Sequence, residues 1–405
     1  MQILALNCGG SSIKYKVFSM PEEKVMVRGS VERIGSRETT LRHQDLTGEA
    51  AEYRKHLPRG DYGEALAEIL KLLQPHRLEA VGHRVVHGGA SLRRPARIDA
   101  AVLATLKACC QLAPLHNPAN IAGIEAVSRL LPDIPQVAVC DNTFHLSLPP
   151  RAYLYGLPYE YYERYGLRRY GFHGITFTYM VNRAAEFLGR DLQELKIVSL
   201  MLGSGTTANA CCCGESIDVS TGFTPTEGLL QSTRCGDVDP GALVYLLRQE
   251  GLSPDALEEV INKKGGWLGI AGVSNDYRAV EEAARQGHER ARLALDVLAY
   301  RAKKYIGAYA AAMGGIDVLI FSGGIGEKSS GLRREICRGL EFLGIELDAE
   351  RNENGSDDRL ISSPEAKVQV LVVHTDEEVM IARETVKVLA GEEPSGAARS
   401  SGAPW

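Results

Sequence analysis

The sequence lacks any long hydrophobic run. Of its 405 residues, 44% are hydrophobic and 24% are charged, but no apolar segment approaches the roughly 18 residues that a membrane-spanning helix needs. Met1 and Gln2 lead directly into an apolar segment, without the basic region and cleavage site of a signal peptide. We therefore expect a cytoplasmic chain of ordinary globular composition that is long enough for two domains.

An excess of basic residues and a paired cysteine pattern are also absent. Lys and Arg number 46 and Asp and Glu number 51, so the formal net charge is −5 and the basic surface that nucleic-acid binding needs is not expected. The nine cysteines include the contiguous runs 109–110 and 211–213, unlike the paired spacing of a zinc site or the density of a secreted disulfide scaffold. We interpret them as small apolar residues, with a metal site as a remote alternative.

Strand-like and helix-like segments alternate along most of the chain. The predicted strands include 3–6, 79–86, 136–140, 318–321 and 368–373, and the predicted helices include 63–73, 101–112, a segment from about 175, 288–313 and 376–389. This alternation predicts an α/β fold. Residues 392–405 have no periodicity and are expected to form a disordered tail.

Two glycine-containing segments follow the same pattern. I-L-A-L-N-C-G-G-S-S-I-K begins at Ile3, and I-V-S-L-M-L-G-S-G-T-T-A begins at Ile197. Each has an apolar strand, then Gly with small hydroxyl residues, then a second β-compatible segment. Glycine lets backbone N–H groups converge on a ligand, and Ser or Thr adds short donors. Facing each other across a cleft, the two hairpins would be able to hold a polyphosphate, although either alone is equally typical of a tight hairpin.

The common nucleotide-binding motifs are absent or incomplete. No G-x-x-x-x-G-K-[ST] occurs. Residues 203–208 match G-x-G-x-x-A, but the residues that follow favour a strand instead of the required helix, and Glu227 lies in a Gly/Pro-rich loop instead of at a strand end. A nicotinamide-dependent oxidoreductase is therefore a remote alternative. A third glycine cluster, S-G-G-I-G-E-K-S at 322–329, follows a strand and precedes a helix, which favours either a nucleotide seat or close helix–strand packing.

Four further segments place Arg, His or Asp beside or near Gly or Pro, and a fifth places Thr and Glu there. They are G-H-R-V-V-H-G-G from Gly82, L-A-P-L-H-N-P from Leu112, Y-G-F-H-G from Tyr170, G-F-T-P-T-E-G from Gly222 and T-R-C-G-D-V-D-P from Thr233. In this combination and order, from Asn7 to the helix after Glu377, the chain resembles the acetate and propionate kinase family. The resemblance implies the superfold of actin, the sugar kinases and the heat-shock ATPases, with two similar domains, a nucleotide cleft between them and a homodimeric assembly.

The implied reaction is reversible, direct in-line transfer of the ATP γ-phosphoryl group to acetate or a similar short-chain acid, which gives an acyl phosphate and ADP with Mg²⁺ or Mn²⁺. Such an acid has a pKa of about 4 to 5 and is already ionised at neutral pH, so the protein must mainly position the reactants and supply positive charge. The resemblance assigns residues 1–144 and a C-terminal helix at about 380–391 to the acyl-side domain, and 145–379 to the nucleotide-binding domain.

The resemblance also implies a set of site residues. Arg84 and Arg234 would flank the carboxylate and the phosphoryl group, because a guanidinium fork fits oxyanions, and His173 would donate to a phosphoryl oxygen. The implied catalytic residues are Arg84, Asp141, His173 and Arg234; the acyl pocket is Val86, Leu115, Phe172 and Pro225; the metal residues are Asn7 and Glu377; and the nucleotide-binding residues are Ser12, Lys14, Gly203, Ser204, Gly205, Asp276, Tyr277, Arg278, Gly324 and Ile325.

The chain departs from the family pattern at several positions. Residues 201–205 read M-L-G-S-G where the family has H-L-G-N-G, and Met offers no donor to a phosphate. The other departures are Gly10 for Ser, Asn142-Thr143 for Thr-Ala, Ile175-Thr176-Phe177 for Thr-Ser-His and Asp376 for Asn. Each lost charge-assisted bond would weaken phosphate binding by roughly 1.5 to 3 kcal/mol. The alternatives are a nucleotide-binding paralogue with a regulatory role and little catalysis, or pyrophosphate as the donor.

Overall fold

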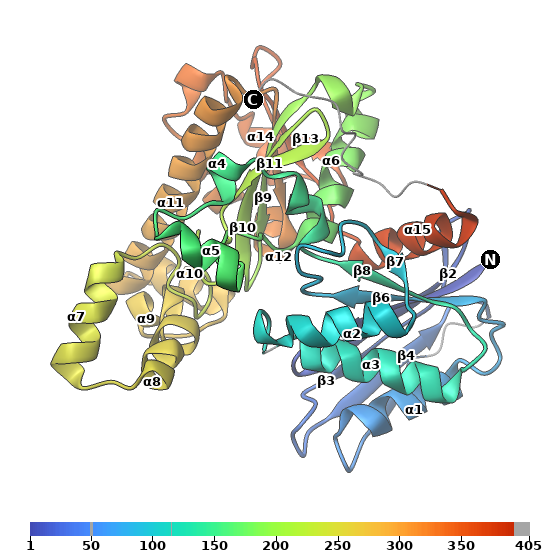
Figure 1. Ribbon diagram of the computed structural model, residues 1–405. Helices are drawn as coiled ribbons and strands as arrows, with labels where there is room; N and C mark the ends of the chain where they lie inside the picture. The colour runs from blue at the N-terminus through green and yellow to red at the C-terminus, as the bar shows by residue number, and fades with distance from the viewer. Residues whose placement is uncertain (49–51, 115, 393–405) are drawn as a thin grey trace. The chain divides into compact units, whose positions relative to one another are not determined.

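The computed structural model describes residues 1–48, 52–114 and 116–392, which form two compact units. Of the described residues, unit 1 contains Met1–Leu146, Gly174–Thr178 and the chain from Asp376 to Glu392, and unit 2 contains Ser147–His173 and Tyr179–Thr375. Each unit has one β-sheet with helices packed on it (Figure 1). Within the described ranges no helix is long and apolar enough to cross a membrane.

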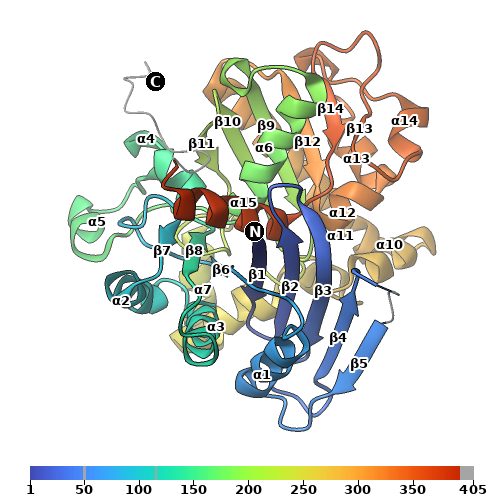
Figure 2. The same ribbon diagram turned by 90° about the vertical axis from the view of Figure 1, so that its right-hand side faces the viewer.

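The sheet of unit 1 has eight strands in the order β5-β4-β3-β2-β1-β6-β8-β7. They are β1 (Gln2–Cys8), β2 (Ser12–Ser19), β3 (Lys24–Glu32), β4 (Thr40–Asp45), β5 (Glu52–His56), β6 (Ala80–Val85), β7 (Ala96–Arg97) and β8 (Gln136–Cys140). The helices α1 (Tyr62–Leu72), α2 (Ala100–Ala108) and α3 (Asn117–Leu130) cover one face, and α15 (Glu377–Ala390) covers the other (Figure 2). The core therefore has two layers, because alternate side chains of β1 point to opposite faces.

The sheet of unit 2 has six strands in the order β11-β10-β9-β12-β14-β13. They are β9 (Lys196–Leu202), β10 (Thr206–Cys212), β11 (Glu215–Val219), β12 (Val318–Ser322), β13 (Arg359–Leu360) and β14 (Gln369–Val372). The helices in this part of the chain are α4 (Pro150–Tyr153), α5 (Tyr159–Tyr165), α6 (Gly174–Leu188), α7 (Pro240–Glu250), α8 (Pro254–Glu259), α9 (Gly266–Ala271), α10 (Tyr277–Arg285), α11 (Glu289–Met313), α12 (Gly323–Lys328), α13 (Ser330–Cys337) and α14 (Ala349–Glu353).

The two sheets repeat one topology. In unit 1, β3, β2 and β1 are antiparallel neighbours, β6 and β8 continue the sheet in parallel, and β7 is antiparallel to β8. Unit 2 follows the same scheme. Its antiparallel neighbours are β11, β10 and β9, the parallel strands are β12 and β14, and β13 is antiparallel to β14. The two similar segments at Ile3 and Ile197 are the equivalent strands β1 and β9. The predicted α/β architecture of two actin-like halves is confirmed.

The third glycine cluster differs from its prediction. The sequence predicts a turn before a helix, whereas the cluster itself forms α12 and a second helix, α13, follows directly. The turn is confined to Gly323, which has a φ of +78°, and a Cβ there would lie 2.6 Å from the carbonyl oxygen of Leu202. Only glycine fits this position, because both its backbone angle and its close approach to β9 exclude a side chain. The predicted tail lies outside the described residues from 393 onward.

A buried histidine on β6 couples the stability of unit 1 to pH. His83 Nε2 lies 2.8 Å from Gln136 Oε1 on the neighbouring strand β8, and burial lowers the pKa of His83 to about 4. An unfolded histidine has a pKa of about 6.5, so the stabilisation from the neutral ring is complete above that pH and is lost as the pH falls through about 4.

The free energy of unfolding of the wild-type protein should fall between pH 6.5 and pH 4. We expect this fall to be smaller in His83→Gln by up to about 3 kcal/mol, since 1 pKa unit corresponds to about 1.4 kcal/mol. Urea unfolding at a series of pH values measures this difference. His56→Gln is the matched control, because His56 is exposed on β5 and its replacement should leave the pH dependence unchanged. A wild-type decline that persists in His83→Gln contradicts the assignment.

Candidate active site

Arg84 and Asp141 form a buried ion pair where two parallel strands end. Arg84 lies on β6 and Asp141 follows β8, so the register brings both to the carboxyl edge of the sheet. Arg84 Nη2 and Nε lie 2.6 and 3.1 Å from Asp141 Oδ2, and Asp141 is 1% exposed. The carboxyl ends of parallel strands are the usual place for ligands in α/β sheets.

A chain of polar contacts leads from this ion pair to α15. Arg84 Nη1 donates to Asn7 Oδ1 at 3.1 Å, and Asn7 Nδ2 donates to Glu377 Oε2 at 3.3 Å. The hydroxyl of Thr176 donates to Glu377 Oε1 at 2.6 Å. Of the residues predicted for catalysis and metal binding, Asn7, Arg84, Asp141 and Glu377 thus lie together in unit 1.

The electrostatics of the ion pair keep it charged at neutral pH. Burial raises the pKa of Asp141 to about 6, although Arg84 lowers it and Glu377 adds to the rise. Burial of the guanidinium opposes its charge, but Asp141 and Glu377 raise the pKa of Arg84 above its ordinary value. Asp141 therefore holds the guanidinium in place while the nearby carboxylates keep it fully protonated.

Three buried asparagines fix the loop after β6. Asn120 Oδ1 accepts from Val86 N at 3.0 Å, and Asn117 Oδ1 accepts from His87 N at 3.0 Å. Asn142 accepts from Gly88 N at 2.8 Å and donates to the carbonyl of Gly89 at 2.7 Å. The sequence prediction did not include the first two, although the H-N-P-A-N stretch was a usable signal. The departure at Asn142 satisfies two backbone groups that would otherwise be buried without a partner.

The departure at Asp376 also has defined contacts. Asp376 Oδ1 accepts from Val379 N at 3.0 Å and so caps α15, while Asp376 Oδ2 forms an ion pair with Lys16 Nζ at 2.7 Å. A carboxylate at a helix N-terminus is favourable for both capping and the helix dipole. Because α15 begins with Glu377, this cap fixes the direction of the predicted metal residue.

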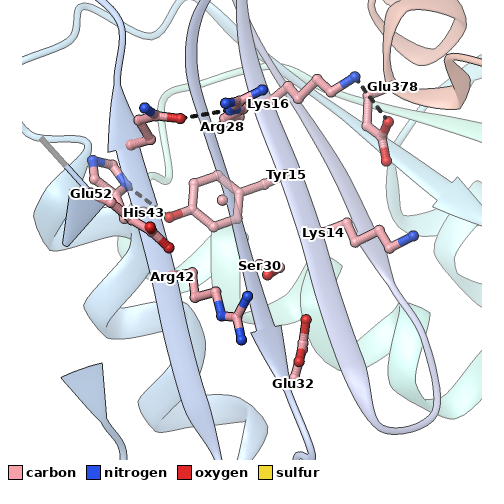
Figure 3. Close-up of a pocket in the computed structure, with 12 residues that line it drawn as sticks. Lys14, Tyr15, Lys16, Arg28, Ser30, Glu32, Arg42, His43, Glu52 and Glu378 are labelled. Atoms are coloured by element: carbon pink, nitrogen blue, oxygen red, sulfur yellow. Dashed lines mark hydrogen bonds and ion pairs between the residues drawn. The ribbon is translucent and has the colours of Figure 1, made fainter. Parts of the chain in front are cut away.

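The first glycine hairpin carries Ser12 and Lys14 at its base. Gly9 N donates to the carbonyl of Ser12 at 2.7 Å and closes the turn. Lys14 lies beside a hollow of about 500 Å³ over the open face of β2, β3 and β4 (Figure 3). Strand register places Lys14, Ser30 and Arg42 in one row across these strands. Carboxylates and cations both line this hollow, which is typical of a solvated sheet face.

His173 lies beside the second glycine hairpin in unit 2. Its backbone is left-handed, with a φ of +60°, and its Nδ1 is 3.0 Å from the hydroxyl of Thr207 on β10. A Cβ on Gly205 would lie 3.4 Å from His173 Cε1, so the hairpin backbone passes directly against the imidazole. Thr207 was not predicted as a site residue, although the T-T-A stretch after the glycines was a signal.

Arg234 lies in the same unit, and its guanidinium bonds to a neutral side chain. Its Nη1 donates to Gln231 Oε1 at 3.3 Å, and among the described residues no carboxylate forms an ion pair with it. Burial lowers the pKa of Arg234 from its usual value, but an arginine remains charged at neutral pH. A half-buried cation with only a neutral partner is suited to binding an anion.

The described residues that were predicted for the acyl pocket belong to both units. Val86 is buried in unit 1, whereas Phe172 and Pro225 belong to unit 2. Phe172 N donates to the hydroxyl of Thr221 at 3.0 Å, and the carbonyl of Pro225 accepts from Gln231 Nε2 at 2.6 Å. Leu115 lies outside the described residues. The acyl pocket therefore stays a prediction.

A hollow of about 570 Å³ in unit 2 joins three segments that the sequence predicts to bind nucleotide. Its lining includes Gly203 and Ser204 from the second hairpin, Asp276, Tyr277 and Arg278 from the start of α10, and Gly324 and Ile325 from α12. Tertiary structure thus brings together residues that are far apart in the sequence. Gly205, which is also predicted to bind nucleotide, is not among the residues that line this hollow and lies beside His173.

Aromatic and polar side chains complete the lining of the nucleotide hollow. Trp267 packs edge-on against Tyr277 with ring centroids 6.0 Å apart, and the Tyr277 hydroxyl lies 3.1 Å from Ser329 Oγ. Glu281 lines the hollow one helical turn after Tyr277. Trp267 and Glu281 were not predicted from the sequence; the helical spacing of α10 was a signal for Glu281, and no pattern indicated Trp267.

Fold and sites together define a two-domain protein of the actin-like class with a nucleotide-sized hollow and a buried cationic centre. A family model described as the acetokinase family matches residues 2–383. The acetate kinase of Dictyoglomus turgidum is 48% identical over 398 residues, which cover 96% of this chain and 98% of that protein. The acetate kinase of Clostridioides difficile is 45% identical and covers 96% of this chain and 100% of its own length.

Solved structures agree with the sequence comparison. Porphyromonas gingivalis acetate kinase superimposes with a TM-score of 0.89 at 44% identity, covering 96% of this chain and 99% of that one. A propionate kinase from Francisella tularensis subsp. tularensis SCHU S4 superimposes with a TM-score of 0.89 at 35% identity, covering 95% and 98%. The chain belongs to the acetokinase family.

The substitution Gly324→Ala, which adds one methyl group, tests whether nucleotide binds in this hollow. Gly324 lines it, and a Cβ there meets no atom within 4 Å. We expect Gly324→Ala to fold normally, because Ala favours helix over Gly, and to weaken ADP binding about tenfold, because an added methyl in a filled site costs 1–3 kcal/mol. Isothermal titration and thermal unfolding measure the two effects.

Gly331→Ala is the matched control for this substitution. Gly331 lies on α13, has the same open space for a Cβ and does not line the hollow. Its replacement should leave ADP affinity within about twofold of the wild type. Equal affinities in the two variants would show that the nucleotide binds elsewhere.

Proposed function

We propose that this protein transfers the γ-phosphoryl group of ATP reversibly to acetate or a similar short-chain acid, giving an acyl phosphate and ADP. The observation that carries the proposal is the contact chain from Asp141 through Arg84 and Asn7 to Glu377. It holds a fixed guanidinium beside two carboxylates and an amide, which are the groups that a carboxylate substrate and a hard cation require. Membership of the acetokinase family supports the same activity.

The proposed reaction is a direct displacement at phosphorus. A carboxylate oxygen of the acid forms a bond to the γ-phosphorus as the bond to the bridging oxygen of ADP breaks, and the electron pair leaves with ADP. No general base is needed, because the acid is already ionised at neutral pH. Arg84 binds the acid, whereas Arg234 and His173 donate to oxygens of the transferring group, where charge is spread in the transition state.

We propose Asn7 and Glu377 as the residues that hold the divalent cation. Mg²⁺ prefers oxygen ligands and is usually bound by one or two carboxylates together with substrate phosphates, so the carboxylate of Glu377 and the amide oxygen of Asn7 fit it. Mn²⁺ has the same ligand preference. When bound, the cation would neutralise charge on the phosphate oxygens.

Thr176 supports this assignment through its contact with Glu377. We expect Thr176→Val, which keeps the shape and removes the hydroxyl, to weaken Mn²⁺ binding by about tenfold, since groups that orient metal ligands affect metal affinity 10- to 100-fold. Electron paramagnetic resonance titration with Mn²⁺ measures the affinity without turnover. Thr178→Val is the control, because its hydroxyl donates to the carbonyl of Gly174 on the same helix. Equal Mn²⁺ affinity in both variants counts against Glu377 as a ligand.

The departures do not favour a non-catalytic paralogue. Thr176 supplies a hydroxyl where the family has Ser, Asp376 caps α15, and Asn142 holds the loop after β6. In the M-L-G-S-G hairpin Met201 offers no donor, whereas the exposed Ser204 keeps a hydroxyl. Weaker phosphate binding, or pyrophosphate as the donor, remains compatible with these contacts. The nucleotide cleft between the domains, the homodimer and the cytoplasmic location stay predictions.

Trapping of acyl phosphate with hydroxylamine tests the proposal. Purified protein with Mg²⁺ and either ATP or pyrophosphate should form product with at least one of formate, acetate, propionate and butyrate. We expect Arg84→Gln and Arg234→Gln each to reduce the rate about 100-fold or more, as loss of one oxyanion donor usually does. Arg183→Gln removes a surface ion pair with Asp358 and should retain activity. Absence of product with every acid and donor, from protein that still binds ADP, would favour the paralogue.

A further inference from the structure

Three side chains of unit 2 outside the described sites form one connected group. Arg169 Nη2 lies 2.5 Å from Glu227 Oε1, and the hydroxyl of Tyr155 donates to Glu227 Oε2 at 2.5 Å. We call Tyr155, Arg169 and Glu227 the clamp. In the sequence, Glu227 was weighed as the acidic residue of a nicotinamide-binding motif. In the structure both oxygens of its carboxylate accept hydrogen bonds.

The clamp binds the backbone after β11. Arg169 Nη1 donates to the carbonyls of Val219, Ser220 and Thr221 at 2.7, 3.0 and 3.3 Å. The Tyr155 hydroxyl accepts from Phe223 N at 2.7 Å. Three separate stretches of chain therefore meet at one carboxylate.

Gly222 lies directly beneath the clamp. A Cβ there would be 1.6 Å from Glu227 Oε2 and 2.3 Å from the Tyr155 hydroxyl, so no side chain fits. The carbonyl of Gly222 accepts from Tyr170 N at 3.0 Å and Gly171 N at 3.3 Å. The backbone that leads to His173 is thus bonded to the segment that the clamp fixes.

The ion pair of the clamp is partly buried and restrains Arg169, although the side chain of Glu227 is 31% exposed. Burial of Arg169 opposes its charge, but Glu227 raises its pKa above the ordinary value. The side chain of Arg169 is 16% exposed, and a buried cation that loses its carboxylate is strongly destabilised. Arg169 is therefore held in one position by Glu227.

His173 needs such support, because its backbone is left-handed at a φ of +60°. A residue other than glycine in this region costs of order 1–3 kcal/mol and persists where the surrounding structure imposes it. The bonds from Tyr170, Gly171 and Phe172 to Gly222 and Thr221 supply that constraint. Pro225, predicted for the acyl pocket, lies in the loop between Gly222 and Glu227.

We infer that Tyr155, Arg169 and Glu227 are positioning residues that fix the His173 imidazole and the Pro225 loop for phosphoryl transfer to the acid. This inference rests on the proposed function. Among the described residues, the hydrogen bonds and the ion pair of the clamp reach none of those that line the nucleotide hollow, so its loss should alter transfer and acid binding more than ATP binding.

The test compares Glu227→Gln, Tyr155→Phe and Arg169→Lys. We expect each to lower kcat about 10- to 100-fold, because misplacement by about 1 Å has effects of this size, and to leave the KM for ATP within about twofold. Arg169→Lys keeps the charge but cannot reach three carbonyls and Glu227 together, so it should not rescue activity. Arg183→Gln is the control for loss of an ion pair in the same unit.

A second readout is independent of turnover. In protein labelled with ¹³C-histidine, the Cε1–H resonance of His173 is assigned by its loss in His173→Asn. We expect this resonance to shift in Glu227→Gln and to stay in place in Arg183→Gln. If the wild-type protein makes no acyl phosphate, the proposed function fails while this resonance still tests the positioning.

Two results would overturn the inference. An unchanged His173 resonance in Glu227→Gln, with kcat near that of the wild type, would mean that the clamp does not reach the imidazole. Parallel losses of kcat, ATP affinity and melting temperature in all three variants would mean that the clamp only stabilises unit 2.

Discussion

The buried ion pair between Arg84 and Asp141 is the interaction on which the proposed chemistry depends. Taking two charges out of water is unfavourable, and removing one partner of such a pair leaves the other uncompensated, at a cost of about 3–5 kcal/mol. The protein meets this constraint with rigid supports: parallel strands β6 and β8 carry the two charges, and Asn7 accepts from the guanidinium. A fixed cation is what an incoming carboxylate needs, because little reorganisation is then left for the reaction step.

The same physical logic explains three departures from the family pattern. Asn142 and Asp376 replace other residues, yet each satisfies a backbone group beside the site. Thr176 keeps the hydroxyl that binds Glu377. At the second glycine hairpin Met201 supplies no donor.

His173 depends on a different kind of support. Its left-handed backbone is imposed by hydrogen bonds from the residues before it to Gly222 and Thr221, and these in turn are held by Arg169 and Glu227. Unit 1 therefore fixes Arg84 through a direct ion pair, whereas unit 2 fixes the backbone at His173 through main-chain hydrogen bonds.

Sequence alone determined the α/β class and the repeated glycine hairpins, because strand periodicity and Gly-rich turns are local signals; the charged site residues stay a prediction from the resemblance. It also identified the family through the motifs around Arg84, His173 and Arg234. Only tertiary structure decided that Trp267 and Glu281 line the hollow, that the third glycine cluster is helical, and that Glu227 binds Arg169 and Tyr155. These features arise from contacts between distant segments, whose partners no local pattern specifies.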